Sequence, residues 1–368
     1  MPETCTAAVL EKIAQPLKLK TVPIPKTVPG AATVRVLATV LSPNVKDVFA
    51  GAFGPISVGT PVIPSMASIA RIHSAGGDAT VLKPGQLVFT DFWTQSRDDP
   101  DDSILAGYMG GNDILESVWN NGTFAEYASV PLERVWPLDE SLLCEKLGYT
   151  VAELAYLGNI CISFGGLMTV NVLPGDSVVV APATGTFGGA AVHAAVAMGA
   201  KVIACGRNDQ MLSRIAEAFS SSGRLTTVKL SEDVNEDVAA IRAAAGGKGA
   251  DKFVDFSPTQ ATGSKLLAAG ISALRPNGRV AIVGGILQNV EIPYFTVMRN
   301  NIRIEGRYMF DRMHVLQAIK LLESGQLVIG DRPNSGMKVH SFKLTDWEQA
   351  LDTAAECRGW GNMVVLEP

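Results

Sequence analysis

Three small residues have the spacing that is typical of a dinucleotide-binding turn. Ala183, Gly185 and Gly188 occupy the three glycine positions of the pattern G-x-G-x-x-G, with alanine in the first. A glycine at the second position lets the backbone come close to a pyrophosphate, and the amides that open the following helix point at its negative charge. The triplet alone is a weak signal, because it also fits a glycine-rich connection in an unrelated α/β sheet.

The segments on either side of the triplet favour the nucleotide-binding interpretation. Residues 177–181 are apolar and mostly β-branched, which is typical of a strand that is buried on both faces. Residues 190–198 are apolar nearly all round and end at Gly199, as in a helix that packs on a sheet and stops at a glycine. Residues 201–205 predict a second strand, so the region forms one βαβ unit.

The residues that follow the second strand indicate which dinucleotide binds. An NAD-specific site places a carboxylate there to bind the ribose diol. In this chain Gly206 is followed by Arg207 and Asn208, so a 2′-phosphate would meet a cation and an amide. We therefore predict that the cofactor is NADP(H). The residues assigned to its binding are Thr184, Gly185, Thr186, Phe187, Gly188, Gly206, Arg207, Asn208, Ser257, Gly284 and Gly285.

Composition limits the class of protein and its partners. The 368 residues, 47% of them hydrophobic, suffice for two globular domains, and the net charge of −5 argues against a nucleic-acid partner. Residues 1–15 lack the apolar core of a secretory signal. The most apolar region, 152–173, contains Glu153, Asn159 and Asn171, so we expect no membrane span. Five cysteines without a C-x-x-C pair fit the reduced thiols of a cytoplasmic protein, and the expected partner is a small-molecule substrate.

The pattern of strands and helices changes along the chain. Before residue 147 the chain is β-rich and interrupted by prolines, and from 147 to 306 strands and helices alternate. Such alternation predicts a doubly wound parallel sheet, an α/β fold. We expect 1–146 and 307–368 to form one domain into which 147–306 is inserted. The strands expected in the inserted domain are 177–181, 201–205, 226–230, 252–256, 279–283 and 302–306, with helices near 187–198, 210–220, 233–245 and 260–273.

Four short motifs give the chain a resemblance to the medium-chain dehydrogenase/reductase superfamily over nearly its whole length. Residues 122–127 resemble the family's G-x-F-A-E-Y strand, and residues 83–86 resemble its K-x-G-D turn, with glutamine for the acid. Residues 172–176 resemble the turn that leads into the nucleotide fold, and residues 362–365 resemble the closing G-K-x-V strand, with asparagine for lysine. The resemblance implies a Rossmann sheet inserted into a β-rich, GroES-like catalytic domain.

The motifs of the family's zinc-dependent alcohol dehydrogenases are missing. Those enzymes carry a cysteine before an aspartate and, further on, Gly-His-Glu, whereas residues 44–47 read Asn-Val-Lys-Asp and residues 65–67 read Ser-Met-Ala. The third family ligand falls near Gly158, and residues 94–121 contain no cysteine for a structural zinc. A catalytic zinc needs about three protein ligands, which neither the methionine nor the alanine supplies. We therefore expect metal-independent chemistry and no metal ligand.

Asn44 and Asp47 instead resemble the N-x-x-D of the zinc-free quinone and enoyl reductase branch, in which the amide side chain lies by the nicotinamide and the substrate. Asn44 fits a turn cap after Pro43 equally well. Asp47 fits the N-cap of a helix that begins at Val48 better than it fits acid chemistry. The branch often has a tyrosine where this chain has Phe49, so no proton donor is carried over.

The anion that hydride transfer leaves on a carbonyl or polarised alkene must be stabilised by a protonated side chain, backbone amides or water. Beside Asn44 and Asp47, we assign Tyr108 in the variable loop as a catalytic candidate, although a tyrosine is more often a packed aromatic with a satisfied hydroxyl. His193 lies within the helix after the glycine turn, and we interpret it as structural. Tyr149, Tyr156, Tyr294 and Tyr308 are further candidates for the donor.

Together these features predict a zinc-independent, NADPH-dependent oxidoreductase that transfers hydride to an activated C=C or C=O of a small organic substrate, such as an enone, quinone, ketone or imine. The alternative is an NADP(H)-binding protein of the same fold with weak or no redox activity, to which the altered Gln86, Phe49 and Asn362 point. Residues 49–67 and 94–121 set the pocket, so the sequence leaves the substrate and the direction of reaction open.

We also expect a homodimer. In the superfamily that the chain resembles, the sixth strand of the nucleotide domain lies at a sheet edge, and an unpaired edge exposes backbone donors and acceptors. Residues 302–306 form this strand, and we expect Arg307, Tyr308, Met309 and Phe310 beside it to face the surface with the composition of an interface core. Two copies that pair across a two-fold axis would cover both edges.

Overall fold

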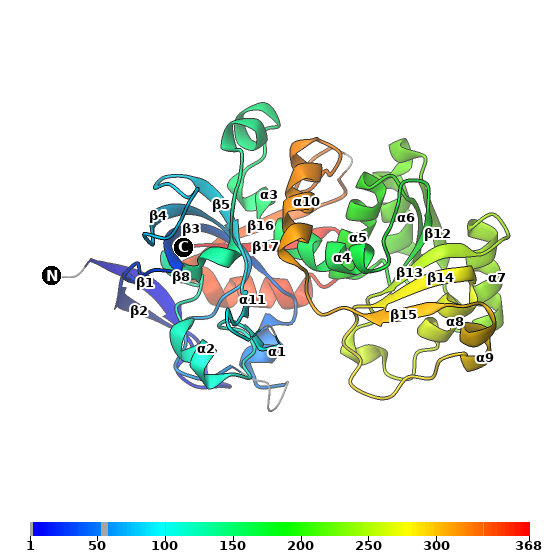
Figure 1. Ribbon diagram of the computed structural model, residues 1–368, viewed down its shortest axis with the longest axis horizontal. Coiled ribbons are helices and arrows are strands. Elements are labelled where there is room, and N and C mark those ends of the chain that lie inside the picture. Colours follow the sequence, from blue (N-terminus) through cyan, green and yellow to red (C-terminus); the bar gives the residue numbers. More distant parts are fainter. Residues whose placement is uncertain (1–2, 53–57, 100, 334) are drawn as a thin grey trace. The chain divides into compact units, whose positions relative to one another are not determined.

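The computed structural model describes residues 3–52, 58–99, 101–333 and 335–368 (Figure 1). The chain divides into two compact units. Unit 1 contains residues 1–158, 338–358 and 362–368, and unit 2 contains residues 159–337 and 359–361. The chain therefore crosses from one unit to the other four times, and the last two crossings are only three residues apart.

Unit 2 is built on a six-stranded parallel sheet. The strand order is β12-β11-β10-β13-β14-β15, so the chain order reverses between β10 and β13. This order is that of a doubly wound dinucleotide-binding sheet, which confirms the predicted fold class. The strands are β10 (Ser177–Ala181), β11 (Lys201–Gly206), β12 (Leu225–Lys229), β13 (Ala250–Asp255), β14 (Leu274–Ile282) and β15 (Arg303–Gly306).

Helices alternate with these strands, as the pattern of the sequence predicted. The centre of the sheet is fully covered, because Val179, Ile203, Phe253 and Val280 are at most 2% exposed. The helices are α4 (Leu157–Thr169), which begins in unit 1, α5 (Thr186–Ala197), α6 (Asp209–Ala218), α7 (Val234–Ala244), α8 (Leu266–Ser272), α9 (Tyr294–Arg299) and α10 (Arg312–Glu323).

Unit 1 is β-rich and contains a mixed sheet in the order β16-β17-β3-β4-β5-β9, with β8 also paired to β3. The strands are β1 (Thr4–Val9), β2 (Lys18–Pro23), β3 (Ala31–Leu41), β4 (Ser68–Ala75), β5 (Leu87–Thr90), β6 (Trp93–Gln95), β7 (Ser103–Leu105), β8 (Tyr127–Pro131), β9 (Val135–Pro137), β16 (Lys338–Lys343) and β17 (Asn362–Glu367). The helices are α1 (Val45–Phe49), α2 (Asp113–Val118), α3 (Val151–Leu154) and α11 (Trp347–Glu356). Both ends of the chain contribute to this unit, as the GroES-like arrangement requires.

The segment 307–337 belongs to unit 2, whereas the sequence led us to expect it in the domain of the chain ends. Its start is bound to α4: Arg307 Nε donates to Thr169 Oγ1 at 2.9 Å, and a Cβ on Gly165 would come within 2.4 Å of the Met309 carbonyl oxygen. This packing leaves Met309 7% and Phe310 2% exposed. The expectation that both face the surface is therefore wrong.

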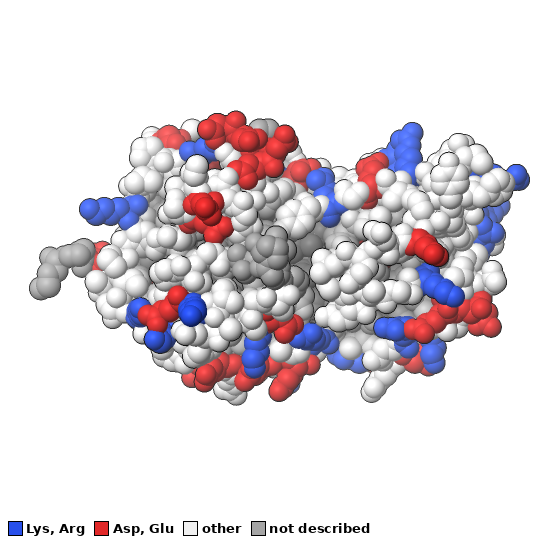
Figure 2. All heavy atoms as spheres, turned by 90° about the horizontal axis from the view of Figure 1, so that it is seen from below, with Lys and Arg blue, Asp and Glu red and all other residues white. Residues whose placement is uncertain are grey.

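The surface carries both signs of charge. Figure 2 shows acidic and basic side chains scattered over the face that it draws, in small mixed groups. By length and composition the stretch Val151–Thr169 could cross a membrane, but 78% of it is buried inside the protein, as in a core helix.

Candidate functional site

The turn between β10 and α5 is fixed by backbone contacts. The Ala183 N–H donates to the Cys205 carbonyl oxygen at 2.7 Å, which ties the turn to the end of β11. Gly188 lies in the first turn of α5, where an added Cβ would lie 2.0 Å from the carbonyl oxygen of Pro182. Only glycine fits there, so the third position of the fingerprint serves the close packing of α5 on the turn.

Gly185 is different, because the protein itself does not require a glycine at this position. Its φ of −85° is open to any residue, and an added Cβ would meet only the Pro182 carbonyl oxygen, at 3.8 Å, among the described residues. Gly185 is the N-cap of α5 and supplies no side-chain acceptor to the first amides of the helix. The space beside Gly185 and the amides of α5 are therefore suited to an anionic ligand that approaches the backbone closely.

Three more of the predicted cofactor residues follow the neighbouring strands β13 and β14. Ser257 Oγ donates to Asp255 Oδ1 at 2.5 Å, and the Gly285 N–H donates to the Ser257 carbonyl oxygen at 2.9 Å. A Cβ on Gly284 would lie 2.4 Å from that same carbonyl oxygen, so glycine is required there. Since Asp255 pairs with Ala181 in the sheet register, these turns lie at the same edge as the glycine turn.

Asp255 was not assigned from the sequence, although it is the acidic residue of this edge. It is 3% exposed, and burial raises the pKa of its carboxyl to about 6, while the hydrogen bonds from Ser257 act in the opposite direction. A strand that ends in an acid two residues before a serine was the available signal. Asp255 holds the Ser257 turn in place.

The end of β11 presents the residues predicted to select the dinucleotide. Gly206 allows close approach of the preceding turn, because a Cβ there would lie 2.7 Å from Thr184 Cγ2. The side chain of Arg207 is 73% exposed and forms an ion pair with Glu232, Nη1 to Oε1, at 2.7 Å. Asn208 is the N-cap of α6, and its Oδ1 accepts the Met211 N–H at 3.0 Å. Arg207 thus offers a cation at the strand end, while the carbonyl of Asn208 is used to cap the helix.

The Asn44 and Asp47 pair lies on the short helix α1 of unit 1. Asn44 precedes the helix but makes no side-chain capping hydrogen bond, and Asp47 lies inside it. Asp47 Oδ2 accepts from Arg358 Nη2 at 3.0 Å. The prediction of Asp47 as an N-cap is therefore wrong, because α1 begins at Val45 and the carboxylate binds a cation far away in the sequence. Phe49, where the related branch often has tyrosine, is buried edge-on against Phe124.

The positions that hold a catalytic zinc in related enzymes are filled by close packing. Met66 and Ala67 are 5% and 3% exposed, and the Met66 N–H lies 3.0 Å from Thr123 Oγ1. A Cβ on Gly158 would lie 2.5 Å from the Cβ of Ala67, so even a small ligand side chain has no room at this position. Within the described ranges, no three His, Cys, Asp or Glu side chains gather in a group that could hold a metal ion. The residues present do not fit a zinc ion.

Tyr108 is a buried aromatic in unit 1. It is 8% exposed and packs edge-on against Phe92, with ring centroids 5.6 Å apart. Of the other tyrosines, Tyr156 is 1% exposed and burial raises the pKa of its hydroxyl, whereas Tyr294 and Tyr308 are 78% and 61% exposed. The structure therefore places Tyr108 in a packed aromatic environment.

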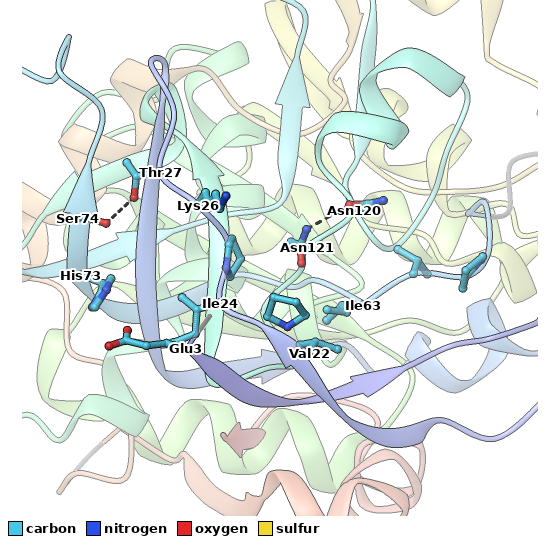
Figure 3. A pocket seen from close by; sticks show the side chains of 14 residues that line it. Glu3, Val22, Ile24, Lys26, Thr27, Ile63, His73, Ser74, Asn120 and Asn121 are labelled. Carbon is cyan, nitrogen blue, oxygen red and sulfur yellow. Dashed lines mark hydrogen bonds between the residues drawn. The ribbon is translucent and has the colours of Figure 1, made fainter. Parts of the chain in front are cut away.

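A separate hollow of about 760 Å³ opens on the surface of unit 1. Figure 3 shows Glu3 and His73 at the left of this hollow, Lys26 and Ile24 in the middle, and Asn121 and Ile63 at the right. Ile63 and Asn121 belong to the two loops, 49–67 and 94–121, that were expected to set the substrate pocket. Of the described residues around this hollow, none is a predicted catalytic or cofactor residue.

Comparisons with known proteins agree with this architecture. The model of the alcohol dehydrogenase GroES-like domain matches residues 28–140, and that of the zinc-binding dehydrogenase family matches residues 187–324. An alcohol dehydrogenase of Rhizobium meliloti (strain 1021) is 25% identical over 88% of this chain and 90% of its own length. An NAD-dependent alcohol dehydrogenase of Sulfurisphaera tokodaii is 22% identical over 97% of this chain and 98% of its own length.

Among solved structures, a protein of Sinorhizobium meliloti 1021 described as a zinc-binding dehydrogenase, with NADP bound, shares the fold with a TM-score of 0.76 at 18% identity, over all of both chains. The two family models together cover most of the chain, one on each unit. The chain belongs to the medium-chain dehydrogenase/reductase superfamily. It is an oxidoreductase of the alcohol dehydrogenase type of fold, with a GroES-like domain and a Rossmann-like domain.

Proposed function

We propose that this protein is a metal-independent reductase that uses NADPH to reduce an activated C=C or C=O bond of a small organic molecule. The observation that carries the proposal is the packing of Gly158 on Ala67, which fills the zinc position, in a chain whose dinucleotide turn leaves the space beside Gly185 open. A Rossmann turn without a zinc site supports hydride transfer in which something other than a metal stabilises the charge that develops on the substrate.

NADPH is proposed over NADH because of Arg207. Its partner Glu232 is also exposed, at 68%, and exposed ion pairs contribute only about 0–1 kcal/mol, so the guanidinium can exchange that carboxylate for a phosphate. A 2′-phosphate accepts bidentate hydrogen bonds from arginine, which a ribose hydroxyl does not. The relatives include an NAD-dependent enzyme and a neighbour in fold with NADP bound, so the preference must be measured.

When bound, NADPH would supply a hydride to the electrophilic carbon of the substrate, and a proton would complete the reduction at the oxygen or at the carbon next to the carbonyl. The chain would hold the pyrophosphate at the first amides of α5 and the 2′-phosphate at Arg207. The side chain of Asn44 makes no capping bond to α1, and we propose that its amide donates a hydrogen bond to the oxygen that gains charge. The proton would come from Tyr108 or from solvent.

The experiment that tests the proposal has two steps. Titration with NADPH and with NADH, followed by nicotinamide fluorescence, measures both dissociation constants. A panel of enones, quinones, ketones and imines then shows whether bound NADPH is oxidised. Binding with oxidation supports a reductase, and binding without oxidation by any acceptor supports the alternative of an NADP(H)-binding protein with little redox activity. Failure to bind either dinucleotide would overturn both.

A further inference from the structure

A segment of three residues near the end of the sequence reaches the cofactor turn through two of them, Gly359 and Trp360. Gly359, Trp360 and Gly361, which we name the Gly-Trp-Gly segment, belong to unit 2, although the residues before and after them belong to unit 1. The Trp360 N–H donates to the carbonyl oxygen of Thr184 at 2.9 Å. A Cβ on Gly359 would lie 3.1 Å from that same oxygen. The segment therefore lies directly against the residue that precedes Gly185.

This hydrogen bond fixes the orientation of one peptide group. The carbonyl of Thr184 and the N–H of Gly185 belong to the same peptide unit, which is planar and trans, so the two groups point in opposite directions. When the carbonyl is held toward Trp360, the N–H of Gly185 must point to the other side. Gly185 is the N-cap of α5, where amide groups are directed at an anion.

The indole ring of Trp360 locks the segment against two helices. Trp360 is 1% exposed, and an added Cβ on Gly189 of α5 would lie 2.2 Å from its Cδ1. The guanidinium of Arg214 on α6 lies 5.7 Å from the ring centroid. The ring thus packs on both helices that begin at the proposed cofactor site, α5 at the pyrophosphate and α6 next to Arg207.

The indole nitrogen is bound as well. Trp360 Nε1 donates to His193 Nε2 at 3.2 Å, so His193 carries its proton on Nδ1 and donates it to the Val328 carbonyl oxygen at 3.0 Å. Burial lowers the pKa of His193 to about 4, which keeps the ring neutral and able to accept from the indole. The indole N–H and the backbone N–H of Trp360 are therefore both hydrogen-bonded, the first to His193 and the second to Thr184.

The flanking glycines let the chain reach and leave this position. Gly359 has φ of +117° and Gly361 has φ of +92°, a region that residues with a side chain rarely adopt. Two residues before Trp360, Arg358 is paired with Asp47 of α1. These bends let the chain place Trp360 against Thr184 within unit 2, although Arg358 and Asn362 on either side of the segment belong to unit 1.

We propose that Trp360 is a positioning residue for the cofactor: it orients the Thr184–Gly185 peptide and holds α5 and α6 so that the amides of the turn bind the pyrophosphate of the dinucleotide. The inference rests on the proposed function, since it concerns the same cofactor site. It assigns a role to the C-terminal segment, which lies about 175 residues after the fingerprint in the sequence.

The test uses two ligands that engage different parts of the site. NADPH contains the pyrophosphate, whereas 2′-AMP carries only the adenosine 2′-phosphate that Arg207 would bind. Trp360→Ala keeps the backbone N–H and removes the ring that holds the segment in place. We expect the dissociation constant of NADPH to rise about tenfold, because the amides of the turn are then no longer held toward the charged pyrophosphate, and that of 2′-AMP to stay within about twofold. Equal loss of both ligands would indicate a general loss of structure and would overturn the positioning role, as would unchanged binding of NADPH.

A second variant approaches the contact from the other side. Gly189→Ala inserts a methyl group where the indole lies, although alanine is otherwise favourable within a helix. It should weaken NADPH binding about tenfold in the wild-type background and have little further effect in Trp360→Ala, since the two residues act through one contact. If Trp360→Ala does not fold, Gly189→Ala and Trp360→Phe decide the question, with unchanged NADPH binding in both counting against the proposal.

The matched control is Trp136→Ala, which removes a tryptophan of similar burial from the core of unit 1, where it packs on Phe89 at 5.7 Å. It should lower thermal stability without changing the affinity for either ligand. The two proposals fail in different ways. A wild-type protein that binds neither NADPH nor 2′-AMP contradicts the proposed function, whereas a wild type that binds both, with variants that behave like it, contradicts only the role of Trp360.

Discussion

Gly158 and Ala67 are packed so closely that a Cβ on Gly158 would lie 2.5 Å from the Cβ of Ala67. The resemblance to zinc-dependent members of the superfamily places one of their metal ligands at Ala67 and another near Gly158. A ligand side chain at residue 158 would have to displace Ala67, and Val40 Cγ1 would lie 3.1 Å from the same added Cβ. The side chains around Gly158 are thus apolar and closely packed.

Chelation should therefore leave the protein unchanged. We expect reductase activity and the melting temperature to survive exhaustive dialysis against a chelator, because no ligand set for zinc is present at residues 44, 66, 67 and 158. Metal analysis by mass spectrometry of the purified protein checks the result. Zinc at close to one equivalent per chain, lost together with activity, would refute the expectation.

Arg207→Ala should weaken NADPH binding about tenfold and leave NADH binding unchanged, because only NADPH carries the phosphate that the guanidinium would bind. Glu232→Gln is the matched variant: it removes the carboxylate that competes for Arg207 and should strengthen NADPH binding by about twofold. Fluorescence titrations at two salt concentrations measure both effects. Equal affinity of the wild type for NADPH and NADH would contradict the assignment of Arg207.

His193 should make the protein less stable at acidic pH. Its pKa is about 4 when folded and about 6.5 when unfolded, so the unfolded chain binds a proton first as the pH falls. The contribution of His193 is fully present above about pH 6.5 and is lost toward pH 4. The free energy of unfolding of the wild type should therefore fall between pH 7 and pH 5 by about 2 kcal/mol more than that of His193→Gln. Urea unfolding at both pH values, for both proteins, provides the measurement.

Two buried carboxyl groups also change the stability of the protein with pH, so the effect of His193 is measured as a difference between the wild type and His193→Gln. The pKa values of Asp91 and Asp255 are each raised to about 6, chiefly by burial, so their protonation favours the folded state as the pH falls and acts against the effect of His193. The difference between wild type and His193→Gln removes these shared contributions. An identical pH dependence in the two proteins would exclude His193 as a source of acid sensitivity.

We propose that the protein forms a homodimer through the edge of the sheet in unit 2. Strand β15 ends the strand order there. Exposed aromatic side chains lie on α9 before this strand, with Tyr294 78% and Phe295 65% exposed, and just after it, with Tyr308 61% exposed. Light scattering at micromolar concentration should report twice the chain mass of 38.8 kDa. Phe295→Asp should shift the mass toward one chain, whereas Leu173→Asp, at a similar exposure of 53%, should not. A wild type that is monomeric at this concentration would rule the dimer out.

Much of unit 2 could be predicted because its signals are local. Strand β10, for example, has the bounds that the apolar run 177–181 predicted, and Gly185 marks the start of α5 as expected. Whether the residues just after a strand are buried is harder to predict, because it depends on residues that are distant in the sequence. Nothing in the sequence near Met309 and Phe310 shows that Gly165 of α4 leaves room for them, so they were assigned to the surface.

In the candidate site, too, local sequence predicts some residues, whereas others depend on contacts between distant parts of the chain. The glycine turn and Arg207 follow from their own neighbours in the sequence. Asp47 was wrongly predicted as an N-cap, because α1 begins at Val45 and the partner of the carboxylate, Arg358, lies 311 residues away. Trp360 was missed for the same reason, although a tryptophan between two glycines was a visible signal that a ring is held at a sharp bend. Local pattern thus predicts the turn, and long-range packing decides what holds it.

The most direct test of the account is the oxidation of NADPH by chelator-treated protein in the presence of a panel of enones, quinones, ketones and imines. The loss of nicotinamide absorbance is followed with NADPH and, in parallel, with NADH. The account predicts that at least one acceptor is reduced, that NADPH is the better donor, and that added zinc does not raise the rate. Tight binding of NADPH without oxidation by any acceptor, or a rate that appears only when zinc is restored, would contradict it.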